Sequence, residues 1–277
     1  MKNRLASAAV LALLCLDIGV AQADATLERI EQRHRISVGV MLTGAPFGTI
    51  DPQTRQHQGY NVELARELGK RLGVETETVS VLAPNRVQFL QQGKVDVLIA
   101  NMQYTDERAQ ILDYVPTPYE QVGGAALMHK GAGISSWADL KDKPVCVSQG
   151  SNFIEPLQQY GAQIKAFRSQ SESLLSLRGN GCVAAVHVSP TMHGLLDNAE
   201  WSDYEIPLGS DLIPSDSVIW LRKGEKDTQA RIDAIVRDWH RSGWLLELGE
   251  RTGMHPSAAL HALHDKYKNA PALQAAQ

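Results

Sequence analysis

The sequence predicts an α/β protein of two lobes joined by two crossover strands. Runs typical of strands alternate with helical patterns, which favours parallel sheets covered by helices. This alternation occurs twice, on either side of a linker that contains Gly131 and Gly133. Two further segments, 122–130 and 216–223, are expected to cross between these units. Two connections between two lobes make a hinge, and hinged lobes close over ligands.

The first unit is expected to follow a strand–helix–strand order. A helix is predicted at 25–33 and a strand at 35–41, and a longer helix runs from Gly59 until Gly73 stops it. A strand at 75–81 and a helix at 84–90 follow. The apolar run 95–100 then predicts a strand buried on both faces, after which Thr105 can cap a helix that starts at Asp106.

The second unit repeats this order after the linker. A short helix is predicted at 136–140, a strand at 144–148, a helix starting at the turn 150–152, a helix at 171–178 and a strand at 182–188. A last strand is expected at 216–222, with largely helical chain from 224 onward. We therefore assign residues 24–124 and 217–277 to lobe 1 and residues 125–216 to lobe 2.

The N-terminus is typical of a secretory signal peptide, which we assign to residues 1–23. Lys2 and Arg4 precede a mostly apolar stretch, and the small residues Ala21-Gln22-Ala23 offer a cleavage site. Cys15 leaves a lipoprotein as an alternative, although lipidation sites require a smaller residue than the preceding Leu14. No later run approaches the ~20 apolar residues that span a bilayer. The mature protein is expected in the periplasm.

Composition and cysteine count narrow the function further. The chain is 43% hydrophobic and 21% charged with a net charge of −4, which is ordinary for a globular protein and gives no electrostatic case for nucleic acid. Removing the signal peptide leaves Cys146 and Cys182 in two predicted strands. An exported pair favours a disulfide if the strands are neighbours, and the alternative is two buried free thiols.

Polar residues gather where the buried strand 95–100 ends, which is where open α/β sheets bind ligands. Asn101 and Gln103 follow that strand, and Arg108 lies in the first turn of the next helix. The planar guanidinium of Arg108 can bind a carboxylate with two parallel hydrogen bonds. Alternatively, Arg108 is a solvated surface arginine. In lobe 2, the turn Gly150-Ser151-Asn152 offers N–H groups to an anion, or is an ordinary cap.

The order and spacing of five short motifs resemble the family 3 extracellular solute-binding proteins of polar amino acid ABC transporters. The motifs are Gly59-Tyr60-Asn61-Val62-Glu63-Leu64-Ala65, Gly93-Lys94-Val95-Asp96-Val97, Thr105-Asp106-Glu107-Arg108, Pro118-Tyr119 and Trp137-Ala138-Asp139-Leu140-Lys141. The resemblance runs from about Leu27 to Leu248, and members with cysteines like Cys146 and Cys182 exist in this family.

The resemblance implies a type II periplasmic binding protein, a Venus flytrap that hands its ligand to an ABC permease. A monomer is expected. Arg108 matches the arginine that clamps the ligand α-carboxylate, and Asn101 and Gln103 match positions that add polar contacts from lobe 1. Gly150, Ser151 and Asn152 match the lobe 2 turn that cradles the same carboxylate.

Two departures from the family pattern concern the ligand amine. His187 stands where many relatives carry an aspartate that pairs with the α-amino group, and Met41-Leu42-Thr43-Gly44 replaces an acidic residue and an aromatic. A neutral His187 can accept one hydrogen bond from an amine but lacks a fixed charge. Unless the strand register is shifted toward Ser189 or Asp197, the ligand is expected to be a carboxylate other than a conventionally held amino acid.

Two other functions share this fold. A periplasmic dehydratase of the cyclohexadienyl type needs a positioned acid in the cleft, for which Glu155 and His187 are weak candidates. A sensor would present the closed lobes to a receptor instead of a permease. We expect a binding protein without catalytic residues, metal or cofactor, since the sequence carries no metal-ligand cluster, triad or phosphate loop.

Overall fold

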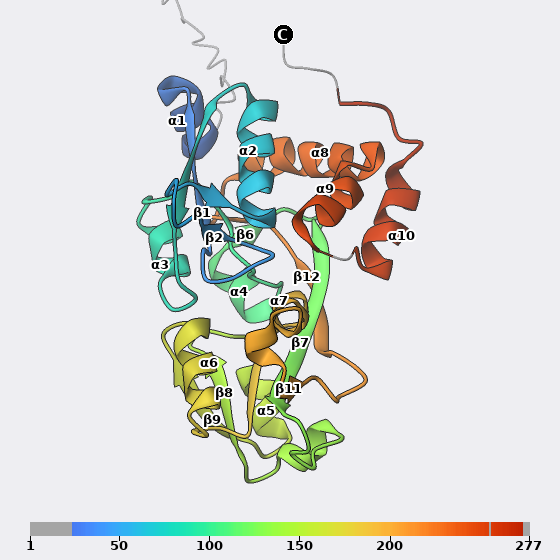
Figure 1. The fold of residues 1–277 in the computed structure, drawn as a ribbon. Coiled ribbons are helices and arrows are strands. Elements are labelled where there is room, and N and C mark those ends of the chain that lie inside the picture. The colour runs from blue at the N-terminus through green and yellow to red at the C-terminus, as the bar shows by residue number, and fades with distance from the viewer. Residues whose placement is uncertain (1–23, 255, 274–277) are drawn as a thin grey trace, which may run out of the picture.

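The computed structural model describes residues 24–254 and 256–273, so the predicted signal peptide lies outside the described residues. The chain forms two lobes, one above the other in Figure 1, each built on its own sheet. Two long strands run between the lobes. This is the two-lobed α/β fold that the sequence predicts.

The sheet of lobe 1 has the strand order β4-β1-β5-β13-β6, with β1 parallel to β4 and β5 and with β13 antiparallel to its neighbours. Its strands are β1 (Arg35–Val40), β4 (Glu75–Ser80), β5 (Val97–Ile99), β6 (Asp113–Tyr114) and β13 (Trp220–Leu221). The N-terminal helices of this lobe are α1 (Ala25–Arg33), α2 (Tyr60–Leu72), α3 (Arg86–Gln91) and α4 (Asp106–Ile111). The chain returns to add α8 (Lys226–Ser242), α9 (Trp244–Thr252) and α10 (Ala258–Tyr267), and a small hairpin pairs β2 (Thr49–Ile50) with β3 (His57–Gln58).

The sheet of lobe 2 has the order β11-β7-β10-β8-β9, and β12 also pairs with β7. Its strands are β7 (Glu120–His129), β8 (Pro144–Ser148), β9 (Gln163–Phe167), β10 (Ala184–Val188), β11 (Tyr204–Glu205) and β12 (Leu212–Ser217). Its helices are α5 (Ile154–Gln159), α6 (Gln170–Arg178) and α7 (Ser189–Leu196), with short 3-10 turns η1 (Trp137–Leu140) and η2 (Ala199–Trp201).

The crossover strands β7 and β12 pair antiparallel and pass between the lobes (Figure 1). Their register shifts between Leu212 and Ser215, which marks a bulge. At the lobe 1 end, Ser217 of β12 forms an isolated bridge with Gln103. The predicted lobe boundaries at 124/125 and 216/217 fall within these two strands, and they stay predictions.

Four details differ from the sequence-based expectations. The strand expected at 216–222 is divided, because the chain leaves one sheet at Ser217 and joins the other at Trp220. The helix expected at Gly150 starts only at Ile154, because the Ser151 hydroxyl accepts the Phe153 N–H and holds the chain in a turn. Cys182 precedes its strand, which starts at Ala184. Strand β9 and helix α7 were not predicted.

A disulfide joins Cys146 and Cys182, with Cα atoms 5.8 Å apart. Cys146 lies in β8, which pairs parallel with β10, and Cys182 stands two residues before that strand. The neighbouring strands on which the disulfide prediction depended are therefore present. Within the described ranges, no helix has the length and apolar character needed to cross a membrane.

Candidate functional site

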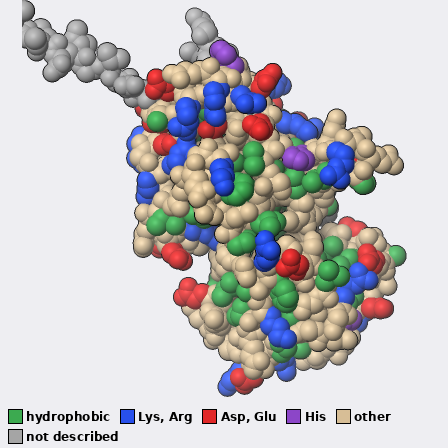
Figure 2. Space-filling model, turned by 90° about the vertical axis from the view of Figure 1, so that its left-hand side faces the viewer, with side chains coloured by type: hydrophobic (Ala, Val, Ile, Leu, Met, Phe, Trp, Pro, Cys, Tyr) green, Lys and Arg blue, Asp and Glu red, His purple; other side chains and the backbone are tan. Residues whose placement is uncertain are grey.

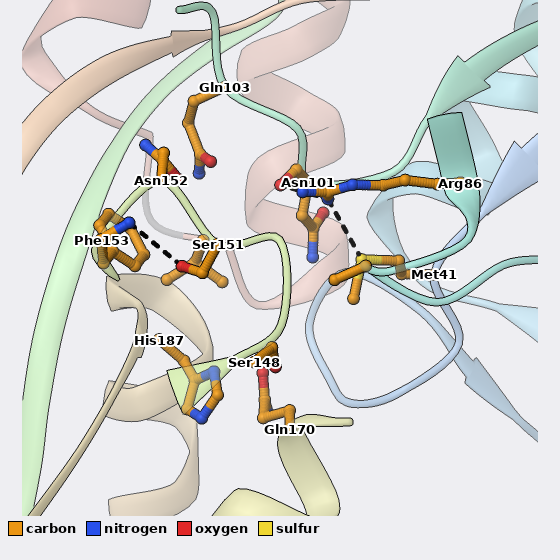
Figure 3. A pocket seen from close by; sticks show the side chains of 12 residues that line it. Met41, Arg86, Asn101, Gln103, Ser148, Ser151, Asn152, Phe153, Gln170 and His187 are labelled. Carbon is orange, nitrogen blue, oxygen red and sulfur yellow. Dashed lines mark hydrogen bonds between the residues drawn. The ribbon is translucent and has the colours of Figure 1, made fainter. Parts of the chain in front are cut away.

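A pocket lies where the two lobes face each other, and Figure 2 shows the lobes meeting across a narrow furrow. Six of the eight predicted ligand-binding residues line it. The twelve lining residues are Met41, Ala83, Arg86, Asn101, Gln103, Ser148, Ser151, Asn152, Phe153, Gln170, His187 and Val188. The cavity has a volume of about 40 Å³. Figure 3 shows these side chains converging from both lobes.

The lobe 1 wall presents amide donors that follow strand β5. Asn101 has a positive φ of 49°, a conformation that asparagine tolerates better than most residues. The Asn61 amide donates to Asn101 Oδ1 at 2.5 Å, which leaves the Asn101 amide nitrogen directed into the pocket (Figure 3). Gln103 is 1% exposed, and its Nε2 is buried without a hydrogen-bond partner among the described residues.

Arg86, at the start of α3, is a pocket residue that the sequence analysis did not single out. Arg86 is 4% exposed, and its guanidinium donates to the carbonyl oxygens of Ala100 at 2.7 Å and Asn101 at 3.1 Å. It also contacts the sulfur of Met41 at 3.6 Å (Figure 3). Burial, together with the nearby charge of Arg108, lowers the pKa of Arg86 to about 9. No carboxylate in the described part of the chain forms an ion pair with it.

Arg108 lies beside the pocket and does not line it. Thr105 caps α4 as predicted, accepting the Arg108 N–H at 3.2 Å. The Arg108 guanidinium donates to the Gln103 carbonyl at 2.6 Å and to the Gly150 carbonyl of lobe 2 at 3.0 Å. Arg108 and Gly150 line a wider cleft next to the pocket. Burial lowers the pKa of Arg108 to about 10.

The lobe 2 wall presents neutral groups. His187 is buried, and its Nε2 lies 2.8 Å from the Ser173 hydroxyl, which leaves Nδ1 as the ring nitrogen on the pocket side (Figure 3). Burial lowers the pKa of His187 to about 3, so the imidazole is neutral above that pH. Ser148 and Gln170 complete this wall, and neither was predicted.

The pocket is therefore rich in donors and cationic. None of its twelve lining residues is an aspartate or glutamate. Two arginines approach it, and both donate to the same lobe 2 oxygen, since Arg86 Nη2 lies 3.4 Å from Gly150 O. Glu155 lines only the wider cleft. The described residues contain no group of three or more His, Cys, Asp or Glu side chains that could hold a metal ion.

Comparison with known proteins identifies the family. The model described as "Bacterial extracellular solute-binding proteins, family 3" matches residues 36–253. The chain belongs to this family. The resemblance recognised in the five sequence motifs is thereby confirmed, as is the type II binding-protein fold. Family 3 members are extracellular or periplasmic binding proteins of amino acid ABC transporters, in line with the exported binding protein that the sequence predicts.

Individual family 3 relatives are distant. The L-cystine-binding protein TcyJ of Escherichia coli strain K12 is 28% identical over 233 residues, which cover 82% of this chain and 86% of that protein. The solute receptor for L-cysteine of Neisseria gonorrhoeae is 27% identical with a TM-score of 0.77, covering 82% of this chain and 93% of that one. The ancestral amino acid-binding protein AncCDT-1, a precursor of cyclohexadienyl dehydratase, is 26% identical with a TM-score of 0.74, covering 82% and 99%.

Proposed function

We propose that this protein captures a small carboxylate between its lobes in the periplasm and delivers it to an ABC permease. The observation that carries the proposal is the excess of unpaired donors around the pocket. Gln103 Nε2 and Asn152 Nδ2 are buried without partners among the described residues. A buried donor left unpaired costs about 1–3 kcal/mol, and a carboxylate offers about four acceptor sites.

Arg108 is the proposed clamp for that carboxylate. In the structure, its Nη2 is engaged by the Gly150 carbonyl, an oxygen from the opposite lobe. A ligand carboxylate that takes over this position gains two charge-assisted N–H bonds, which are roughly twice as strong as the bonds to a neutral carbonyl. Ligand binding therefore replaces a weak contact between the lobes with a stronger one through the ligand.

The amine side of an ordinary amino acid has no charged partner in this pocket. His187 is neutral and can only accept a hydrogen bond at Nδ1. Burying an ammonium without a carboxylate partner costs several kcal/mol. We therefore propose that the ligand is an amino-acid-like compound or an organic acid in which a cationic α-amine is not required.

The direct test is isothermal titration calorimetry of the mature protein, residues 24–277, with amino acids, their N-acyl derivatives and small organic acids. We expect binding of carboxylates that lack a free amine, and its loss in Arg108→Ala. His187→Asp supplies the missing charge and is expected to improve binding of free amino acids. The absence of binding by every carboxylate would refute the proposal. Delivery is tested separately, by stimulation of the ATPase of a reconstituted permease.

A further inference from the structure

Helix α10 lies outside the residues that the family model matches, which end at 253. It packs on α8 and α9 and also against β7, near the point where that crossover strand leaves lobe 1 (Figure 1). Two sets of hydrogen bonds connect α10 to this point, one directly and one through α8. Helix α10 is therefore attached to the hinge at a place that does not line the pocket.

The direct connection runs from Ser257 to Glu120, the first residue of β7. The Ser257 hydroxyl caps α10 by accepting the Leu260 N–H at 3.1 Å, and it donates to Glu120 Oε1 at 2.5 Å. Glu120 is 1% exposed, its Oε1 also accepts the Gln121 N–H at 2.8 Å, and burial raises the pKa of its carboxyl to about 7. A carboxyl is costly to bury unless it is hydrogen-bonded, so the bond from α10 helps to hold this side chain in place.

The second connection reaches the segment just before β7. His264 of α10 donates from Nδ1 to the carbonyl oxygen of His240 in α8 at 2.6 Å, and His240 Nε2 donates to the carbonyl oxygen of Pro118 at 2.7 Å. A carbonyl oxygen can only accept, which fixes the donor in both bonds. Pro118 lies two residues before Glu120, so α8 and α10 together restrain the chain as it enters the crossover.

Glu120 marks the point where both crossover strands leave lobe 1. It pairs with Ser217, the last residue of β12, and the Tyr119 N–H donates to the Ser217 carbonyl oxygen at 3.0 Å. Ser217 also forms the bridge to Gln103 of the pocket wall. Hinges bend at a few residues at the ends of such elements, which absorb the change in backbone angles. Residues that are hydrogen-bonded to a packed helix absorb that change less freely.

We propose that α10 acts as a strap on the hinge, restraining the lobe 1 end of β7 and β12 through the Ser257–Glu120 bond and thereby limiting the bending that opens and closes the lobes. The strap acts in the ligand-free protein, so the proposal does not depend on which ligand the pocket takes. Loss of the bond should leave both lobes folded and widen the range of angles between them.

The test measures the distance between the lobes in the ligand-free mature protein, by pulsed electron spin resonance with spin labels at Lys70→Cys in lobe 1 and Gln158→Cys in lobe 2. Both positions are exposed. In Ser257→Ala we expect a broader distance distribution than in the wild type, together with about fivefold faster hydrogen exchange of the α10 amides, the effect of losing one helix cap. The matched control Ser169→Ala removes the cap of α6 in lobe 2, and it should accelerate exchange in α6 without changing the distribution.

Variants of Glu120 test the same bond from its other side. Glu120→Gln keeps an oxygen that can accept the Ser257 hydroxyl and should keep the wild-type distribution. Glu120→Ala should broaden the distribution as Ser257→Ala does, and the two alanines together should add nothing further, because both remove one bond. A wild-type distribution in Ser257→Ala would overturn the proposal and leave α10 as a cover of lobe 1. Equal broadening in Ser169→Ala, or additive effects of the two alanines, would overturn it as well.

Discussion

Lobe 1 and lobe 2 meet at one pocket but bring different chemistry to it. Lobe 1 contributes cationic Arg86, with Arg108 beside it, and amide donors placed at the end of a fully buried strand. Lobe 2 contributes neutral hydroxyl, amide and imidazole groups from strand ends and turns. Under the proposed function, lobe 1 would therefore select the charge of the ligand, and lobe 2 would close around its shape.

Removing a positive charge from lobe 1 tests this difference between the lobes most directly. Arg108→Ala should weaken carboxylate binding by about 2–5 kcal/mol, the cost of truncating one partner of a hydrogen-bonded charge pair. Folding should be nearly unaffected, because Arg108 is only partly buried and donates to two carbonyls that can turn to water. Calorimetry measures the affinity and thermal unfolding checks the fold. Unchanged affinity would mean that lobe 1 does not select through this residue.

The stability of lobe 2 is expected to depend on its disulfide. Cys146→Ser with Cys182→Ser should lower the free energy of unfolding by about 3–4 kcal/mol, since the bridge closes a loop with a sequence separation of 36 residues. Urea unfolding followed by circular dichroism measures the loss. Wild-type protein treated with a reductant should show the same loss, and the double variant should not respond to the reductant. Equal stability of all three samples would contradict a structural role for the bridge.

The buried imidazole of lobe 2 should make stability fall with acidity. The pKa of His187 is about 3 in the folded protein, against the ordinary value of 6.5 in the unfolded chain. Between these values only the unfolded state binds the proton, so stability decreases as pH falls from 6.5 toward 3, by about 2 kcal/mol at pH 5.

In His187→Gln this part of the pH dependence should disappear. Exposed His193 provides the matched control, and His193→Gln should leave the acid loss as it is in the wild type. Urea unfolding at pH 5 and pH 7.5 measures the difference. If the His187→Gln profile parallels the wild type, the imidazole is not held neutral in the folded protein.

The smallest expected effect concerns a neutral contact of lobe 2. Ser151→Ala should weaken ligand binding by about 0.5–1.5 kcal/mol, the net contribution of a single neutral hydrogen bond. The hydroxyl also holds the turn by accepting the Phe153 N–H at 3.2 Å, so thermal unfolding should be measured beside the affinity. A loss as large as that of Arg108→Ala would show that lobe 2 does more than close over the ligand.

Much of this fold could be predicted because many of its helices and strands have a clear local sequence pattern. Helix α2 has apolar residues at helical spacing and ends at Gly73 in the left-handed conformation, and β5 is a wholly buried apolar run. Strand β9 escaped prediction because it is an edge strand whose exposed Gln163 and Lys165 weaken the apolar signal. Helix α7 begins directly after β10, at Ser189-Pro190, without a separating loop.

The site was harder to predict because it is assembled from distant segments. Asn101, Gln103 and His187 follow or lie within apolar strands, a pattern that the sequence displays. Arg86 begins a short helix, and an arginine at such a position is ordinarily solvated. Its burial follows from the packing of α3, which the sequence alone does not show. Conversely, the motif residue Asp96 has a structural role inside lobe 1. Its carboxylate accepts the Ser37 N–H at 2.9 Å and binds Arg33 at 2.7 Å, far from any ligand contact.

The two walls of the pocket are hydrogen-bonded to different points along the crossover strands β7 and β12. Gln103 is bridged to Ser217, which pairs with Glu120 of β7. His187 pairs with Ala125, five residues further along the same strand. A strand of five residues spans about 17 Å. Bending of β7 and β12 between these two points would therefore change the separation of the two pocket walls. Under the proposed function, a ligand held between the two walls would fix their separation and with it the angle between the lobes.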